Sequence, residues 1–177
     1  ILLPSMLEQL DPAGDEQLIA VKNLLSSWDK RAEVDAAEMT IFAVWVPALK
    51  DLLFKDDIKL LEDVPMSKFV YRPPTDGLYR ALKGEVPVPV DVKGALRQSL
   101  ETTLAKLTKD LGKPESDFVN WQWGEYHQLT FVSLCGDSRW KVGPFPLGGS
   151  LRTVAKSTET GEGPFGVGSA ASMRFVV

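Results

Sequence analysis

Hydrophobic residues in the first half of the chain recur at intervals of three and four, the spacing of one face of an α-helix. The first such run ends at the turn-forming residues 11–14, and a second helix is expected from Asp15. A third should begin at Asp35, because Glu38 three residues later completes a capping pattern. Pro47 lies inside this third run and is expected to kink the helix, since proline lacks a backbone donor.

Prolines and turn residues dominate positions 71–89, which are expected to form loops around a short helix at 78–82. Asp91 is a candidate cap for the next helix, and Gly112 is its expected stop. Within that helix, leucines recur every three or four residues: Leu96, Leu100, Leu104, Leu107 and Leu111. We expect this stripe to be buried against a sheet or another helix.

After Asp117 the hydrophobic pattern changes to every second residue, which favours β-strands. The pattern predicts one strand over residues 121–131, with a possible bulge at Gly124. Two further strands are predicted over 151–155 and 173–177. The residues between them, 157–164, are rich in Ser, Thr and Gly and are expected to form a flexible loop.

The two periodicities divide the chain into a mainly helical part, residues 1–112, and a part of mainly strands and loops, residues 113–177. The fold class expected is therefore α+β. With 177 residues, the chain is long enough for one domain or for a large piece of a bigger one. We favour a single C-terminal piece, because the last residues still read as a strand and a strand edge left without cover is unfavourable. The first residue, Ile1, also favours a processed or trimmed chain.

The charges of the chain are mixed along the sequence, and the formal net charge is −4. A phosphate-binding surface needs clustered Lys and Arg, so this pattern argues against a nucleic-acid partner. No apolar run approaches the roughly 20 residues of a membrane helix. Cys135 is the single cysteine, which excludes an internal disulfide, and we expect it to be a small packed residue.

Few residues have the spacing of a catalytic or metal site. His127 is the single histidine, and the acidic residues lack the spacing of a calcium loop. Glu125 and His127 lie two apart on the predicted strand, which would allow an acid/base pair, although a surface or packing role is preferred. Trp121, Trp123 and Phe131 could line an aromatic pocket, but a plain hydrophobic core is the preferred interpretation.

Three motifs in sequence order resemble the penicillin amidase family. A leucine-rich helix ends in Leu111-Gly112, residues 121–131 read Trp-Gln-Trp-Gly-Glu-Tyr-His-Gln-Leu-Thr-Phe, and residues 143–149 read Gly-Pro-Phe-Pro-Leu-Gly-Gly. The resemblance implies an N-terminal nucleophile hydrolase of four-layer αββα architecture. In that family a Ser at the start of the β chain attacks an amide, with its own α-amine as base. This chain would be the C-terminal part of such a β chain.

The resemblance also assigns roles to individual positions. Seven residues match the family motif and are expected to be structural: Trp121, Trp123, Gly124, His127, Phe131, Gly148 and Gly149. No catalytic residue is expected in this chain, because the nucleophilic Ser and the oxyanion-hole Asn belong to a stretch before Ile1. Family members often hold a structural calcium, also outside this stretch, so no cofactor or metal ligand is expected here. Two positions depart from the family pattern: Lys30 replaces a Gly, and Ser150 replaces an Asp.

The function implied by the resemblance is hydrolysis of the amide of an acylated amine, of the β-lactam side chain or acyl-homoserine lactone type. The expected partners are the nucleophile-bearing segment and the α chain, with self-association of the isolated chain. The family resemblance implies a periplasmic or secreted protein. The isolated chain should be inactive. The alternative is a non-catalytic α+β module that binds a partner or ligand through its aromatic strand.

Overall fold

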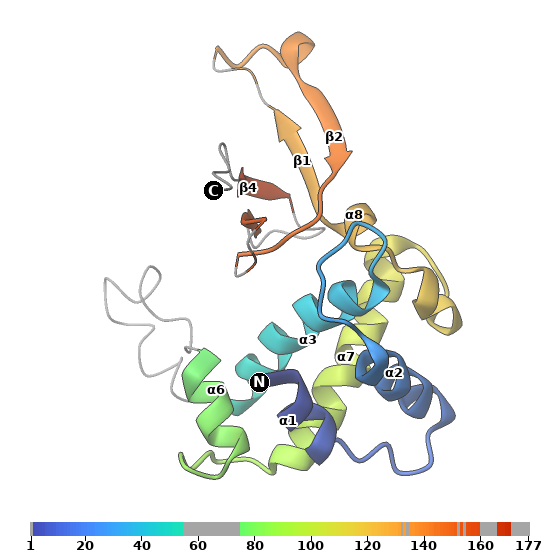
Figure 1. Cartoon of the computed structure of the whole chain (residues 1–177), viewed down its shortest axis with the longest axis vertical. Coiled ribbons are helices and arrows are strands. Elements are labelled where there is room, and N and C mark those ends of the chain that lie inside the picture. Colours follow the sequence, from blue (N-terminus) through green and yellow to red (C-terminus); the bar gives the residue numbers. More distant parts are fainter. Residues whose placement is uncertain are drawn as a thin grey trace. The chain divides into compact units, whose positions relative to one another are not determined.

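The computed structural model describes residues 2–54, 75–131, 133, 135–151, 153, 155–159 and 166–170 (Figure 1). Its α-helices are α1 (Leu2–Gln9), α2 (Glu16–Ser27), α3 (Ala37–Leu53), α6 (Thr75–Leu82), α7 (Val92–Leu111) and α8 (Trp123–Tyr126). Two 3-10 helices are η1 (Glu115–Asn120) and η2 (Ser138–Trp140). The strands are β1 (Gln128–Phe131), β2 (Val142–Pro146), β3 (Ser157–Glu159) and β4 (Val167–Ala170). The mixed α+β class expected from the sequence is confirmed.

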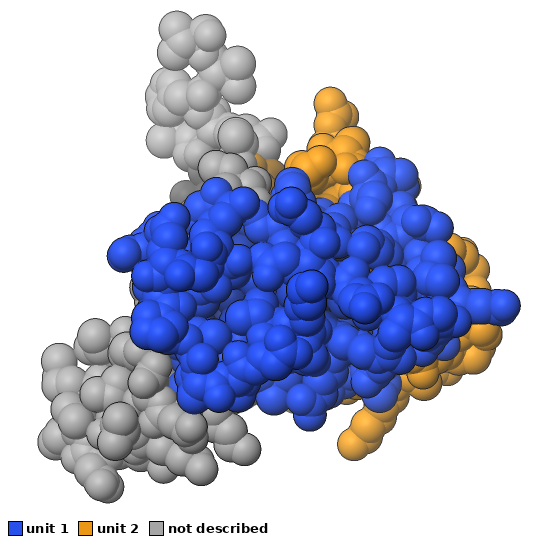
Figure 2. Space-filling model, turned by 90° about the horizontal axis from the view of Figure 1, so that it is seen from below, with its two compact units in different colours: residues 1–27, 43–105 blue, residues 28–42, 106–177 orange. Residues whose placement is uncertain are grey.

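The chain divides into two compact units that interleave along the sequence (Figure 2). Unit 1 comprises residues 1–27 and 43–105, and unit 2 comprises residues 28–42 and 106–177. Helices α3 and α7 each contribute residues to both units. Unit 1 is helical in its described residues, whereas unit 2 contains all four described strands.

Several helix ends follow the signals read from the sequence, although α3 begins at Ala37 and not at the predicted Asp35. The Asp15 carboxylate accepts hydrogen bonds from the backbone N–H groups of Gln17 and Leu18, at 3.0 and 3.1 Å, at the start of α2. The Asp91 carboxylate accepts from Gly94 N–H at 2.8 Å at the start of α7. Gly112, with φ of +63°, follows the last residue of α7. The caps at Asp15 and Asp91 and the stop at Gly112 are therefore confirmed.

Unit 1 has a core of helix-borne apolar side chains. Leu96, Leu100 and Leu104 of α7 are buried there, and Trp45 of α3 donates its indole N–H to the Ser99 hydroxyl at 2.9 Å. Ser99 in turn donates to the carbonyl of Leu96 at 3.0 Å. The Trp45 indole and the Ser99 hydroxyl are thus both hydrogen-bonded, which limits the cost of their desolvation.

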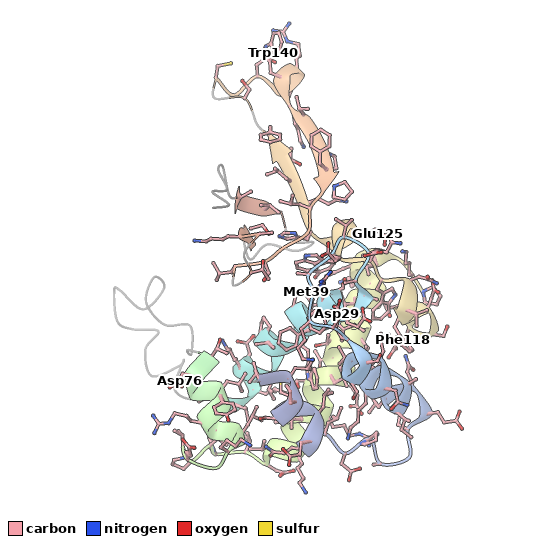
Figure 3. All side chains as sticks on the ribbon, viewed as in Figure 1. Asp29, Met39, Asp76, Phe118, Glu125 and Trp140 are labelled. Atoms are coloured by element: carbon pink, nitrogen blue, oxygen red, sulfur yellow. The ribbon has the colours of Figure 1, made fainter. Side chains whose placement is uncertain are left out.

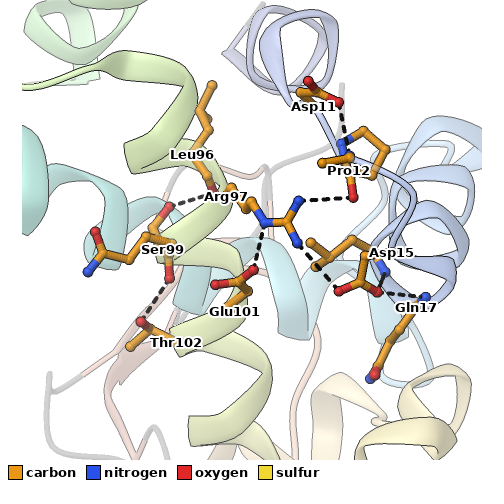
Figure 4. A network of polar contacts seen from close by, with 12 residues as sticks. Asp11, Pro12, Asp15, Gln17, Leu96, Arg97, Ser99, Glu101 and Thr102 are labelled. Carbon is orange, nitrogen blue, oxygen red and sulfur yellow. Dashed lines mark hydrogen bonds and ion pairs between the residues drawn. The ribbon is translucent and has the colours of Figure 1, made fainter.

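A second contact holds the loop before α2 against α7 (Figure 4). Arg97 donates through Nη1 to the Pro12 carbonyl at 3.1 Å and through Nε to Glu101 at 2.8 Å. Its Nη2 atom also lies 3.7 Å from the Asp15 carboxylate. The guanidinium group therefore satisfies a backbone carbonyl and two carboxylates at once, a geometry that suits arginine better than lysine.

The strand predicted over residues 121–131 is wrong in its first half. The structure has α8 at Trp123–Tyr126, closed by a hydrogen bond from His127 N–H to the Trp123 carbonyl at 2.7 Å. Only Gln128–Phe131 forms a strand, β1. An extended residue followed by one helical turn buries Trp121, Trp123 and Tyr126 together. A short run of this kind cannot be distinguished from a strand by periodicity alone.

The predictions for the remaining residues have mixed outcomes. No strand forms at the described residues within 151–155, where Thr153 instead hydrogen-bonds to the backbone of Ser150 in a tight turn. The loop predicted from residue 157 is wrong at its start, because β3 begins at Ser157. Residues 160–164 and the strand predicted at 173–177 lie outside the described residues.

Two small antiparallel sheets complete unit 2 (Figure 1). In the first, β1 pairs with β2 in the register Gln128↔Pro146, Leu129↔Phe145 and Phe131↔Val142. In the second, β3 pairs with β4, and a parallel bridge joins Gln128 to Gly166 just before β4. In the described part of the chain, no helix is both long and apolar enough to cross a bilayer.

Candidate functional site

The segment of residues 32–34, which lies before α3 and enters a turn at Val34, is held on two sides by glycine-containing segments of unit 2. Gly124 N–H donates to the Val34 carbonyl at 2.7 Å, and Gly149 N–H donates to the Ala32 carbonyl at 2.7 Å. We call the arrangement of Gly124, Gly148 and Gly149 around residues 32–34 the glycine clamp. It brings together two of the sequence motifs and a segment that none of them contains.

Close backbone approach explains the glycines of the clamp. A Cβ atom added at Gly124 would collide with the Val34 side chain and would lie 2.8 Å from Pro146 Cβ. One added at Gly148 would lie 2.9 Å from the Ala32 carbonyl oxygen. At Gly149, where φ is +82°, it would collide with a backbone carbonyl oxygen. A side chain at Gly148 or Gly149 would therefore displace backbone, and one at Gly124 would displace the side chains of Val34 and Pro146, which packed structures resist.

Two stacked aromatic rings, Trp123 and His127, are connected to the clamp through Gly149. Trp123 is buried and donates its indole N–H to the Gly149 carbonyl at 2.9 Å. Its ring stacks on that of His127, with centroids 4.4 Å apart and planes 11° apart. His127 Nδ1 lies 2.6 Å from the Leu147 carbonyl, and because a carbonyl only accepts, Nδ1 carries the ring proton. Leu147 N–H donates back to the His127 carbonyl at 3.0 Å.

A polar cluster at the end of α7 ties that helix to α8. The buried Tyr126 hydroxyl donates to the Asp110 carboxylate at 2.7 Å, and Lys106 Nζ donates to the same oxygen at 2.5 Å. Burial opposes the charged form of Asp110, but the hydrogen bonds from Lys106 and Tyr126 outweigh it and hold the pKa of the carboxyl below its usual value. Burial and the bond to Asp110 both raise the pKa of Tyr126 far above its usual value.

The turn before the clamp segment carries the departure from the family pattern noted above. Lys30 adopts φ of +67°, a conformation that glycine accepts without strain and other residues rarely adopt. Trp28 is buried and donates its indole N–H to the Arg31 carbonyl at 2.9 Å, closing the turn. The turn is thus formed with a lysine in the left-handed region.

The structure brings together most of the motif residues and separates others. Six of the seven motif residues are buried or half-buried, and all of these except Trp121 make a contact in or next to the clamp: Trp121, Trp123, Gly124, His127, Gly148 and Gly149. Phe131 is instead exposed at the end of β1, so it does not extend a pocket with the two tryptophans. Glu125 forms a solvent-facing ion pair with Lys113, whereas His127 is buried. The acid/base pair considered for Glu125 and His127 is therefore not formed.

Cys135 does not fit the expectation of a small packed residue, because it is exposed. Its thiol lies 2.9 Å from the Ser133 hydroxyl, a contact that lowers the pKa of Cys135. The one histidine of the chain is buried in the clamp and cannot serve this exposed thiol as a base. Across the described residues, no three His, Cys, Asp or Glu side chains gather as a metal site would require.

Sequence reasoning identified the clamp's glycines and aromatic residues but missed Ala32 and Val34. Their backbone carbonyls are the acceptors, and a backbone carbonyl leaves no mark on residue type. The nearest available signal was the Trp28 turn, whose position fixes where this segment begins. Tyr126 and Asp110 were also missed, because they lie 16 residues apart and the sequence carries no signal for a hydrogen bond between them.

A family model described as penicillin amidase matches residues 2–177. This range includes both compact units and every residue of the glycine clamp. No curated protein matches the chain.

Proposed function

The chain belongs to the penicillin amidase family, and we propose that it forms the C-terminal, structural portion of an amidohydrolase. The reaction is hydrolysis of the amide that links an acyl group to an amine, of the β-lactam side chain or acyl-homoserine lactone type. The nucleophile lies outside these 177 residues. On this proposal, the nucleophile-bearing segment and the α chain complete the layers of the αββα fold.

The observation that supports this proposal most is how the motif residues are used. The His127 ring is buried, donates from Nδ1 to the Leu147 carbonyl and stacks on Trp123. Trp123 donates the single N–H of its indole ring to the Gly149 carbonyl. A catalytic histidine has to reach a proton on a substrate or a nucleophile. We therefore assign the motif residues to structure, as a clamp that fixes the segment Ala32–Val34.

The partners and setting follow from the same proposal. The nucleophile-bearing segment and the α chain supply the serine, its α-amine and the oxyanion donors. Any structural calcium of the assembled enzyme is held by those parts. By family, the protein is periplasmic or secreted. Family membership does not select a substrate among the acylated amines, because specificity resides in the site and not in the fold.

Intact-mass measurement on the protein from its natural source tests the proposal. An antibody against the 177-residue chain should capture a polypeptide that begins with Ser, either as a longer chain or as a co-purifying fragment. The captured material should hydrolyse a chromogenic acyl amide. A single species of 19.5 kDa without such a segment would contradict the proposal.

A second candidate function is a non-catalytic binding module, favoured by the aromatic residues exposed on the β1–β2 hairpin. Phe131, Trp140 and Phe145 all face solvent there. The two candidates differ in a simple readout. A binding module would act as the 177-residue chain alone, whereas the amidohydrolase portion requires the Ser-initiated segment.

A further inference from the structure

The β1–β2 hairpin of unit 2 carries large apolar side chains that no described element covers. The exposed fractions are 56% for Phe131, 69% for Trp140, 53% for Val142 and 47% for Phe145. We call these four residues the hairpin patch. Figure 3 shows Trp140 at the turn end of the hairpin, while the base of β1 follows α8.

Three residues of the patch, Phe131, Val142 and Phe145, form one surface. The rings of Phe131 and Phe145 make an edge contact, with centroids 6.4 Å apart and planes 61° apart. Phe131 also pairs directly with Val142 across the two strands. These side chains therefore lie on one face of the hairpin, and Trp140 precedes β2 at its end. Scattered single apolar residues need no explanation, but a cluster of this kind does.

Two prolines determine how a partner can dock on this hairpin. Pro144 and Pro146 lie in β2, whose outer edge has no strand partner in the described part of the chain. Proline has no N–H to donate, so an added strand could not form a continuous ladder along this edge. A partner on the β2 side is therefore expected to dock through the apolar side chains of the patch and not by extending the sheet.

We infer that the hairpin patch binds a second copy of this chain. The exposed part of the four side chains amounts to on the order of 400 Å², judged from the usual areas of such residues. A standard interface buries about 800 Å² on each partner, of which somewhat more than half is apolar. The patch thus matches the apolar share of one side of a standard interface, and a two-fold dimer needs only this one surface on each copy.

The charges beside the patch also suit a second copy. Asp137 and Arg139 form a bidentate ion pair with each other, at 2.6 to 3.1 Å, and so neutralise one another. Lys141 is the remaining charge between η2 and β2. A strongly charged rim would repel its own copy and call for a partner of opposite sign. The near-neutral rim of this patch would not repel a second copy, and it does not call for a partner of opposite charge. The inference does not depend on the proposed reaction.

Sedimentation equilibrium on the 177-residue chain, from about 1 to 200 μM, tests this inference. We expect a reversible dimer. The variants Trp140→Ser and Phe145→Ser should each weaken it at least tenfold, because buried aromatic anchors dominate interfaces. Both side chains are exposed in the monomer, so at concentrations where the parent chain is monomeric the variants should retain its folding midpoint.

The matched controls are Ile19→Ser and Val90→Ser, two exposed apolar residues of unit 1. Each should leave the dimer unchanged. A chain that is monomeric throughout the concentration range overturns the inference. So does a dimer that survives both hairpin variants, or one that the unit 1 controls dissociate. A monomer that acquires a partner only when the Ser-initiated segment is added would assign the patch to the remainder of the enzyme instead.

Discussion

The backbone N–H of Gly124 donates to the carbonyl of Val34 at 2.7 Å, although the two residues belong to distant parts of the sequence. This contact, with its counterpart between Gly149 and Ala32, holds the backbone of residues 32–34 at two points of unit 2. The family motif therefore has a local physical reason. Its glycines allow the close approach of residues 32–34. Its aromatic residues Trp123 and His127 stack on each other, and Trp123 donates a hydrogen bond to Gly149.

Gly124→Ala should destabilise the chain by about 1 to 3 kcal/mol, the usual cost of forcing atoms into a packed site. The new methyl group would collide with Val34 and crowd Pro146. Reversible urea unfolding, followed by circular dichroism, measures the change. The matched control is the double variant Gly124→Ala/Val34→Ala, which removes the colliding side chain. It should recover part of the loss, and an equal loss in both variants would argue against the clamp geometry.

Trp123→Ala should cost about 3 to 5 kcal/mol, as for other large aromatic residues in a core. Trp123 is buried and hydrogen-bonded to Gly149, so the substitution removes both packing and a donor. Trp140→Ala is the matched control at concentrations where the chain is monomeric, because that side chain is then exposed and should change stability by less than about 0.5 kcal/mol. Urea titration of both variants checks the contrast. A cost below about 1 kcal/mol for Trp123→Ala would mean that the ring is not part of the core.

Lys30→Gly should stabilise the chain, by up to about 1 kcal/mol. Lys30 has a φ of +67°, which strains any residue with a Cβ atom, and glycine relieves that strain at some cost in unfolded-state entropy. Lys30→Ala keeps the Cβ atom and should give no gain. We expect the thermal midpoint of Lys30→Gly to be higher than that of Lys30→Ala in the same buffer. Equal midpoints would show that the turn is not strained.

Tyr126→Phe should cost about 1 kcal/mol at pH 7, because it removes the hydrogen bond to Asp110. The folded-state pKa of Tyr126 is raised above its unfolded value near 10. The stability linked to this group is therefore fully present below pH 10 and declines as the pH rises further, because the unfolded chain then ionises first. The gap between parent and variant should narrow above pH 10. Tyr79→Phe on α6 controls for general alkaline effects, and a constant gap up to pH 11 would contradict the assignment.

Long periodic segments were predictable from sequence, and short ones were not. Helix α7 has twenty residues of consistent leucine spacing, a cap at Asp91 and a stop at Gly112, so several signals agree. Helix α8 has a single turn, and its Trp123 and the buried Trp121 before it are spaced as they would be on one face of a strand. For such a segment, long-range packing decides between helix and strand, and periodicity carries no information about it.

The site was predictable in its residues but not in its partners. The motif indicated Trp123, His127 and the glycines, because indole, imidazole and a missing Cβ atom are properties of residue type. The acceptors at Ala32 and Val34 are backbone carbonyls, which every residue has. The exposure of Phe131 was likewise not predictable, since a strand pattern does not say which face a domain covers.

We propose that this chain supplies part of the framework of an amidohydrolase and not its nucleophile. The most direct test is the hydrolysis of a chromogenic phenylacetyl amide by the purified 177-residue chain. We predict no turnover above the buffer rate, both for the parent chain and for His127→Ala. Turnover by the parent chain that His127→Ala abolishes, in a variant that still folds, would contradict the account, because it would place catalysis in the motif that we assign to the glycine clamp.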